Sequence, residues 1–108
     1  MERIQRKRTK GFKLPANTVC VNRGTKFGNP FKIKLGMTRH MACLAFEDCI
    51  LNNAMVYGWF NSLDESRKQL ERFKWMAENI GLLKGKHLAC FCKPEDECHG
   101  DILLKLAR

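Results

Sequence analysis

The fold is decided by the stretch His87-Leu88-Ala89-Cys90-Phe91-Cys92. Its side chains are apolar on both faces, which is typical of a strand buried inside a sheet. A second strand is predicted at Asn17-Thr18-Val19-Cys20-Val21, because this segment is short, contains β-branched residues and is bounded by turn formers. We expect this second strand to be central in the sheet.

Three helices are predicted from capping residues and from the helical spacing of apolar side chains. They cover residues 38–56, residues 62–81 and the segment from His99 onward, with Thr38 and Ser62 as the first two N-caps. The apolar arc of the first helix is predicted to contain Met41, Cys43, Leu44, Ala45, Phe46, Ile50 and Leu51.

The order strand, helix, helix, strand, helix predicts an α/β fold, with helices packed on a parallel or mixed sheet in a Rossmann-like arrangement. A chain of 108 residues suits a single domain, residues 1–108, of which residues 1–13 form a basic N-terminal arm. No stretch reaches the roughly 18 apolar residues of a membrane span. The basic N-terminus is not followed by the apolar segment of a secretory signal. We therefore expect a cytoplasmic protein without a membrane partner.

The net charge of +9 is unevenly distributed. Residues 1–36 hold ten Lys and Arg against one acidic residue, whereas residues 37–108 hold ten of each sign. A basic block of this kind indicates attraction to phosphate, either in nucleic acid or in a small nucleotide. Basic residues appear again after the first strand, as Arg23 and Lys26. We therefore expect them to form one basic face together with the N-terminal arm.

The loop at residues 22–31 contains two glycines and a proline, which exclude a regular element. Glycine lets the backbone approach a ligand, and cationic and amide side chains suit a phosphate. The candidate phosphate ligands are Arg23, Lys26, Gly28 and Asn29. The alternative is a structural turn in which two phenylalanines, Phe27 and Phe31, fill the core.

A second unusual segment follows the other strand and contains Cys90, Cys92, Cys98, His99 and Asp101. Three interpretations stay open. In the first, Cys92 or Cys98 is a reactive thiol with His99 as its base. In the second, zinc is bound by Cys90, Cys92, Cys98 and His99, although their spacing is unusual for such a site. In the third, the cysteines pack while His99 and Asp101 contact a ligand. In open α/β sheets, ligands bind beyond the carboxyl ends of the strands, so we expect both unusual segments to form one site.

The remaining three cysteines, Cys20, Cys43 and Cys49, lie among apolar residues. Without a secretory signal the thiols should stay reduced. A free cysteine behaves as a small buried hydrophobe, so these three are predicted to pack in the core.

Three blocks of the chain resemble a small family that is common in bacteriophages and classed as a domain of unknown function. The blocks are residues 3–12, residues 23–31 and the pattern Cys90-Phe91-Cys92 followed by Cys98-His99-x-Asp101. The resemblance implies a phage or prophage origin, hence the cytoplasm of a host cell, and a compact α/β fold. It implies no reaction. Gly24 departs from the pattern, which has proline there, and this loosens the loop.

The first functional hypothesis is a nucleotide-directed protein that binds, and in one version processes, a nucleotide or nucleotide-derived ligand. Arg23, Lys26 and Asn29 would hold phosphate, and the Cys/His segment would face the base or sugar. A rival hypothesis is a DNA- or RNA-binding accessory protein in which the arm supplies affinity and the cysteines are structural or bind zinc. A third is a phage protein that binds a host or defence protein. The sequence leaves open whether the protein is an enzyme.

Overall fold

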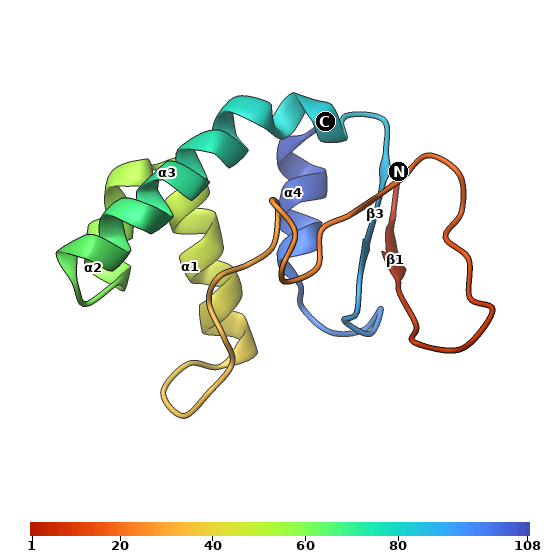
Figure 1. Ribbon diagram of the computed structural model, residues 1–108, viewed down its shortest axis with the longest axis horizontal. Helices are drawn as coiled ribbons and strands as arrows, with labels where there is room; N and C mark the ends of the chain where they lie inside the picture. Colours follow the sequence, from red (N-terminus) through yellow and green to blue (C-terminus); the bar gives the residue numbers. More distant parts are fainter.

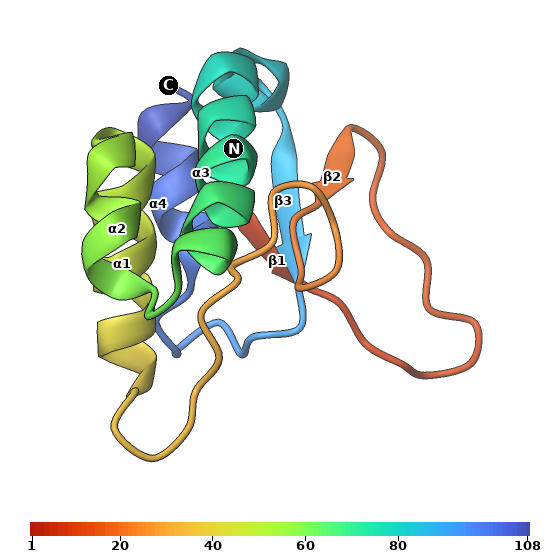
Figure 2. The ribbon, with the colours of Figure 1, turned by 60° about the vertical axis from the view of Figure 1, so that its left-hand side comes forward.

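Three short strands form a parallel sheet in the computed structural model, which describes residues 1–108 (Figure 1 and Figure 2). The strands are β1 (Arg3–Gln5), β2 (Thr18–Cys20) and β3 (His87–Cys90). The order is β1-β3-β2, so β3 pairs with both neighbours. The prediction that the strand near residue 18 is central is wrong, because β2 is an edge strand and the more deeply buried β3 takes the middle.

Strand β1 belongs to the basic N-terminal arm, and the sequence carries no clear signal for it. Its three residues include one apolar side chain, Ile4, which is too little for a readable alternation. The strand exists because β3 offers a second free edge: Ile4 is in register with Ala89, and the Arg6 amide donates to the Cys90 carbonyl. The arm is therefore anchored at its start and extends away from the sheet after β1.

The helices lie together on one side of the sheet, and the chain between β1 and β2 loops out on the other side (Figure 2). Four α-helices are present: α1 (Arg39–Leu51), α2 (Val56–Trp59), α3 (Leu63–Asn79) and α4 (His99–Leu106). This confirms the α/β class with packed helices. A Rossmann-like arrangement is not confirmed. No helix is both long and apolar enough to cross a membrane.

Helix α1 is capped as predicted but ends earlier than predicted. The Thr38 side chain accepts from the Met41 amide. The helix ends at Leu51 rather than Val56, because Asn52 leaves the helical conformation and its side chain accepts from the Ala54 amide. Short polar side chains compete for backbone groups in this way and favour helix ends.

The buried face of α1 differs from the predicted one. The residues that face the core are Ala42, Cys43, Ala45, Phe46, Cys49 and Ile50. Met41, Leu44 and Leu51 are exposed, so that part of the prediction is wrong. Both faces of this helix carry apolar residues, so the pattern alone could not distinguish them, and packing selected the side that contains Phe46.

Helices α3 and α4 begin where the sequence predicts. The Ser62 hydroxyl accepts from the Glu65 amide at the start of α3, and α4 begins at His99 with Cys98 as its N-cap. Gly81 does not end α3 directly, because the α-helix stops at Asn79 and continues as a 3-10 turn through residues 80–83.

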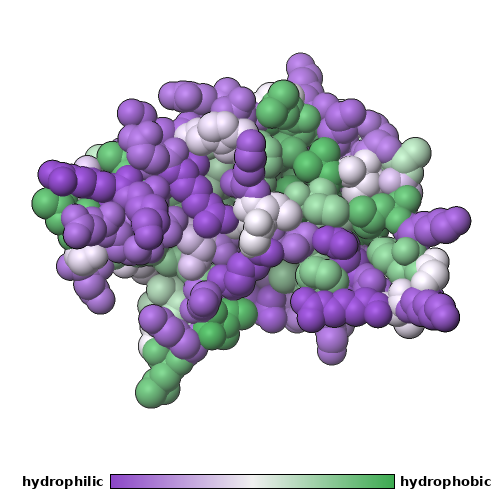
Figure 3. Space-filling view, viewed as in Figure 1, coloured by the Kyte–Doolittle hydropathy of each residue, from purple (hydrophilic) through white to green (hydrophobic).

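The core lies between the sheet and the helices. Phe46 of α1 and Phe73 of α3 are fully buried, and their ring centroids are 5.5 Å apart in an edge-on contact. A pair of buried aromatic rings removes several hundred Å² of surface from water, of the order of 150–250 Å² for each ring. By contrast, the loop before α1 protrudes from the body and exposes Ile33 and Leu35 (Figure 3).

Candidate functional site

A cleft of about 460 Å³ lies at the carboxyl edge of the sheet. Because the three strands are parallel, the segments that follow them emerge at the same edge. The segments that follow β1, β2 and β3 contribute Arg8, Arg23 and Cys92, and the start of α1 adds Arg39. The expected meeting of the basic loop and the Cys/His segment is thus present, and the structure adds two arginines to it.

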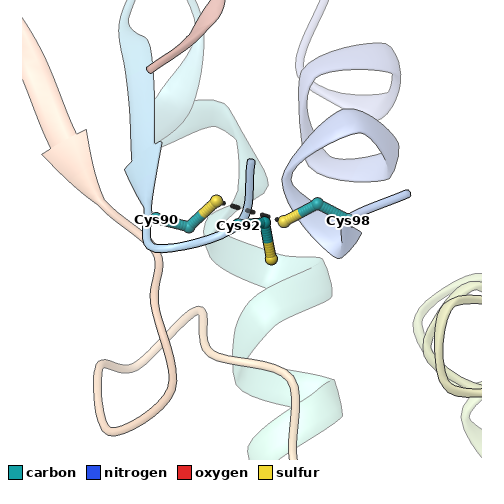
Figure 4. A group of neighbouring side chains, drawn as sticks. All are labelled: Cys90, Cys92 and Cys98. Atoms are coloured by element: carbon teal, nitrogen blue, oxygen red, sulfur yellow. Dashed lines mark hydrogen bonds between the residues drawn. The ribbon is translucent and has the colours of Figure 1, made fainter. Parts of the chain in front are cut away.

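Three cysteines that line this cleft form a cluster between the end of β3 and the start of α4 (Figure 4). Cys90 ends β3, Cys92 lies in the following loop and Cys98 caps α4. Their Sγ atoms all lie within 4.8 Å of one another, and those of Cys90 and Cys98 are 3.2 Å apart. Cys90 and Cys98 are buried, and Cys92 is half-buried. These three cysteines could hold a metal ion.

Each sulfur of the cluster has a hydrogen-bond donor outside the cluster. The Arg3 guanidinium lies 3.8 Å from Cys90 Sγ, and the Arg39 guanidinium lies 3.6 Å from Cys92 Sγ. The backbone amide of Gly100 donates to Cys98 Sγ over 3.4 Å. Cationic groups and a helix N-terminus favour thiolate over thiol, so the surroundings suit negative charge on sulfur.

The Cys90 and Cys98 thiols titrate as a pair. Hydrogen bonds with Cys92 and Cys98, helped by the Arg3 guanidinium, lower the pKa of Cys90. Hydrogen bonds with Cys90 and Cys92, together with burial, raise the pKa of Cys98. Two interacting sites at this separation lose their protons in two distinct steps. The pair therefore loses its first proton more readily than an isolated thiol does, and its second proton less readily.

His99 is buried, with 6% of its surface exposed, and it faces two backbone carbonyls. Its Nε2 lies 2.7 Å from the Val21 oxygen and 3.1 Å from the Phe27 oxygen. Carbonyls only accept, so Nε2 carries the proton and donates to both. Burial lowers the pKa of His99, which keeps the ring neutral and leaves Nδ1 as an acceptor 3.7 Å from Cys98 Sγ. His99 thus ties the Cys/His segment to the loop after β2.

Asp101 lies outside the cleft and pairs with Arg3. Its carboxylate is half-exposed and accepts from Arg3 Nε over 2.9 Å. The Arg3 side chain is 7% exposed and also donates to carbonyls of the loop between β3 and α4, namely those of Cys92, Lys93, Pro94 and Asp96. Asp101 therefore helps to hold a buried arginine. Its position outside the cleft gives no support to the predicted catalytic role.

Of the predicted phosphate ligands of the basic loop, the structure brings Arg23 and Asn29 to the cleft and leaves Lys26 and Gly28 outside it. Arg23 lines the cleft and donates to the carbonyls of Asn29 and Phe31. Asn29 is buried, and its side chain donates to the Ala42 carbonyl and accepts from the Phe31 amide. Its polar atoms already have protein partners, so its position supports the alternative reading of a structural turn.

Lys26 and Gly28 also have local roles. The Lys26 ammonium lies 5.2 Å from the centroid of the Trp75 ring, beside a different depression of the surface. A Cβ on Gly28 would lie 2.7 Å from the Asn22 carbonyl oxygen, so this position requires glycine for packing. Among the four predicted ligands, Arg23 is the exposed cation that faces the cleft.

Arg8, Arg39 and Phe91 complete the cleft, and none of the three was predicted as a site residue. Arg8 lies 4.4 Å from the centroid of the Phe91 ring, which directs its guanidinium to the cleft. Arg39 is the first residue of α1, where no acidic residue is present in the first turn. A cation at a helix N-terminus is unfavourable to the helix dipole. That mismatch is the signal by which Arg39 could have been found.

The fold and the cleft define a small α/β protein whose parallel sheet opens onto an arginine- and cysteine-lined site. The chain belongs to the family described as domain of unknown function DUF4326, whose model matches residues 4–108. This confirms the predicted membership of a family of unknown function. The comparisons gave no significant match to a curated protein or to a solved structure.

Proposed function

We propose that the chain binds a nucleotide or nucleotide-derived ligand in the cleft at the carboxyl edge of the sheet, as a phage-type protein of the host cytoplasm. The observation that carries the proposal is the convergence of Arg8, Arg23 and Arg39 on one cleft. Guanidinium groups bind phosphate through paired, charge-assisted hydrogen bonds. Glu97 is the acidic residue that lines the same cleft, so the local balance of charge favours an anion.

The apolar part of the cleft suits the rest of such a ligand. Phe31, Ile33, Ala42 and Cys43 line it beside the arginines. Its volume of about 460 Å³ falls within the roughly 300–1,000 Å³ that small-molecule sites occupy. In this proposal the phosphate lies against the guanidinium groups, and the base or sugar packs against the apolar side chains.

Any processing of the ligand falls to the cysteine cluster. Cys92 is its half-exposed thiol and lies beside Arg39, whereas Cys90 and Cys98 are buried and the Nε2 of His99 is occupied. A metal ion held by the three cysteines, with zinc as the candidate, would face the bound ligand. The proposal leaves the type of reaction unassigned.

The test compares two exposed cations that differ in position. ATP, GTP and inorganic phosphate are titrated into the wild-type protein, Arg8→Gln and Lys26→Gln by calorimetry. Losing a charge-assisted hydrogen bond costs about 1.5–3 kcal/mol, so Arg8→Gln should weaken nucleotide binding by roughly tenfold or more. Lys26→Gln removes the same charge outside the cleft and should change affinity by less than about twofold, because exposed charges are screened by salt. Equal losses in both variants, or no nucleotide binding, would reject the proposal.

The rival function, binding of DNA or RNA, is favoured by one observation. Lys7, Lys10 and Lys13 are exposed on the segment that loops away from the sheet (Figure 2). Deleting residues 1–13 would also remove β1, so the discriminating variant replaces the three lysines with glutamine. If the segment contacts phosphates of a nucleic acid, this variant should reduce the slope of log affinity against log salt by about 3. A slope unchanged from wild type would exclude this mode of binding.

A further inference from the structure

We propose that Cys90, Cys92 and Cys98 form a three-cysteine Zn²⁺ site whose fourth coordination position opens into the cleft. The three Sγ atoms already lie within 4.8 Å of one another. With Zn–S distances of about 2.3 Å, sulfur atoms of a tetrahedral site are about 3.8 Å apart. The Cys90–Cys98 separation of 3.2 Å and the 4.8 Å limit lie on either side of that value, so side-chain shifts of about 1 Å or less complete the geometry.

The backbone that carries the three cysteines is held in place without a metal. Cys90 ends a paired strand, and Cys98 caps α4. The loop between them is fixed by Arg3, which donates to the carbonyls of Cys92, Lys93, Pro94 and Asp96 over distances from 2.8 to 3.5 Å. A supported backbone is what orients metal ligands in advance.

The charges and hydrogen bonds around the cluster match a metal–thiolate group. Three thiolates and one Zn²⁺ carry a net charge of −1, and the guanidinium groups of Arg3 and Arg39 lie beside the sulfur atoms of Cys90 and Cys92. The Gly100 amide donates to Cys98. Such outer partners stabilise thiolate ligands and tune the bound metal. Thiolate ligands select soft and borderline metals, of which Zn²⁺ prefers four-coordinate tetrahedral sites.

The fourth ligand is not His99, which departs from the four-ligand set considered on the sequence. The Nε2 of His99 donates to the carbonyls of Val21 and Phe27, so only Nδ1, which lies 3.7 Å from Cys98 Sγ, is free to accept. Nδ1 does not lie within 4.8 Å of all three sulfur atoms. The group of close ligand atoms contains the three cysteines and not His99. All three cysteines line the cleft, and Cys92 is the most exposed of them, so we place the remaining position on the cleft side. Three protein ligands and one open position are typical of catalytic zinc sites.

The experiment measures metal in the whole chain, independently of nucleotide. Protein is purified with reductant and without chelator, and bound metal is counted by native mass spectrometry and elemental analysis. The apoprotein is then titrated with Zn²⁺ and with Co²⁺, whose absorption reports thiolate coordination. We expect one metal per chain, and we expect Cys92→Ser to weaken Zn²⁺ binding by at least tenfold, since it removes one of the three ligands.

Two matched variants make the result specific. Cys20→Ser changes a half-buried cysteine on β2, outside the cluster, and should leave metal binding unchanged. Arg8→Gln should also keep the metal, so that failure of the nucleotide proposal and failure of the metal proposal can be told apart. Absence of thiolate–Co²⁺ absorption, metal binding that survives Cys92→Ser, or an iron–sulfur or copper centre in place of zinc would overturn the assignment.

Discussion

At the scale of single residues, His99 has the structural role that its neighbours impose. The ring is neutral, buried and bonded through Nε2 to the loop that follows β2. It also makes an edge-on contact with the Phe46 ring, with centroids 5.1 Å apart. A side chain placed this way connects the loop after β2 with α1 and α4 at one point of the core.

We therefore expect His99→Ala to lower the free energy of unfolding by about 2–4 kcal/mol, because it leaves buried carbonyls without a donor and opens a cavity. His40 is the matched control, since it is exposed and pairs only with Glu97, and His40→Ala should change stability by about 0.5 kcal/mol or less. The measurement is denaturant unfolding of the metal-free protein. Similar stability of His99→Ala and wild type would contradict the structural role.

The pH dependence of stability gives a second check on His99. Burial lowers its pKa in the folded state below the ordinary 6.5, so the unfolded state binds the proton more readily. The contribution of neutral His99 to stability is then full above pH 6.5 and is lost as the pH falls through the folded-state pKa. The stability difference between wild type and His99→Ala should shrink below pH 6.5 in chelator-treated protein. A difference that stays constant from pH 7.5 to pH 5 would count against this assignment.

At the scale of elements, the loop after β2 depends on close backbone packing. Gly28 has no room for a side chain, because a Cβ would lie 2.7 Å from the Asn22 carbonyl oxygen and 3.1 Å from the Thr25 carbonyl oxygen. Backbone atoms cannot move aside as a flexible side chain can. The same loop is held by Arg72 of α3, which donates to the carbonyls of Thr25 and Gly28.

Gly28→Ala is expected to destabilise the protein by about 1–3 kcal/mol, the usual cost of inserting atoms into a packed site. Gly81→Ala is the matched change, because nothing lies within 4 Å of the added Cβ, and it should be neutral or slightly stabilising. Thermal unfolding of the two variants compares them directly. Equal melting temperatures would show that the loop relaxes around the added methyl group.

At the scale of the whole molecule, Arg3 connects parts of the chain that are far apart in sequence. It extends from β1, pairs with Asp101 in α4 and donates to four carbonyls of the loop that contains Cys92. Because its guanidinium offers five donors in a fixed fork, lysine cannot reproduce these contacts.

Arg3→Lys should therefore reduce stability by about 2–4 kcal/mol, since a side chain that is only 7% exposed loses several charge-assisted hydrogen bonds. It should also speed alkylation of Cys92, because the loop around that thiol loses its support. Lys7→Gln, an exposed change in the same basic segment, serves as the control and should leave both readouts unchanged. Unfolding and timed alkylation followed by mass spectrometry measure the two effects. Wild-type behaviour of Arg3→Lys would mean that the loop holds its conformation without the arginine.

The sequence by itself determined the local features of this protein. The sequence indicates the N-caps at Thr38 and Ser62, a strand that begins at His87, the helix from His99 and the two unusual segments. The strand ends at Cys90, two residues earlier than predicted. Capping, periodicity and turn formation involve residues a few positions apart, so a single sequence is enough to indicate them.

Only the tertiary structure decided which of those residues share a site. Arg23 and Lys26 are three residues apart, yet one faces the cleft and the other lies over Trp75. Arg39 joins the site from the start of α1, and β1 joins the sheet because β3 had a free edge. These outcomes depend on contacts between segments up to 98 residues apart in the chain, such as Arg3 with Asp101, and such contacts form only when the helices have packed on the sheet.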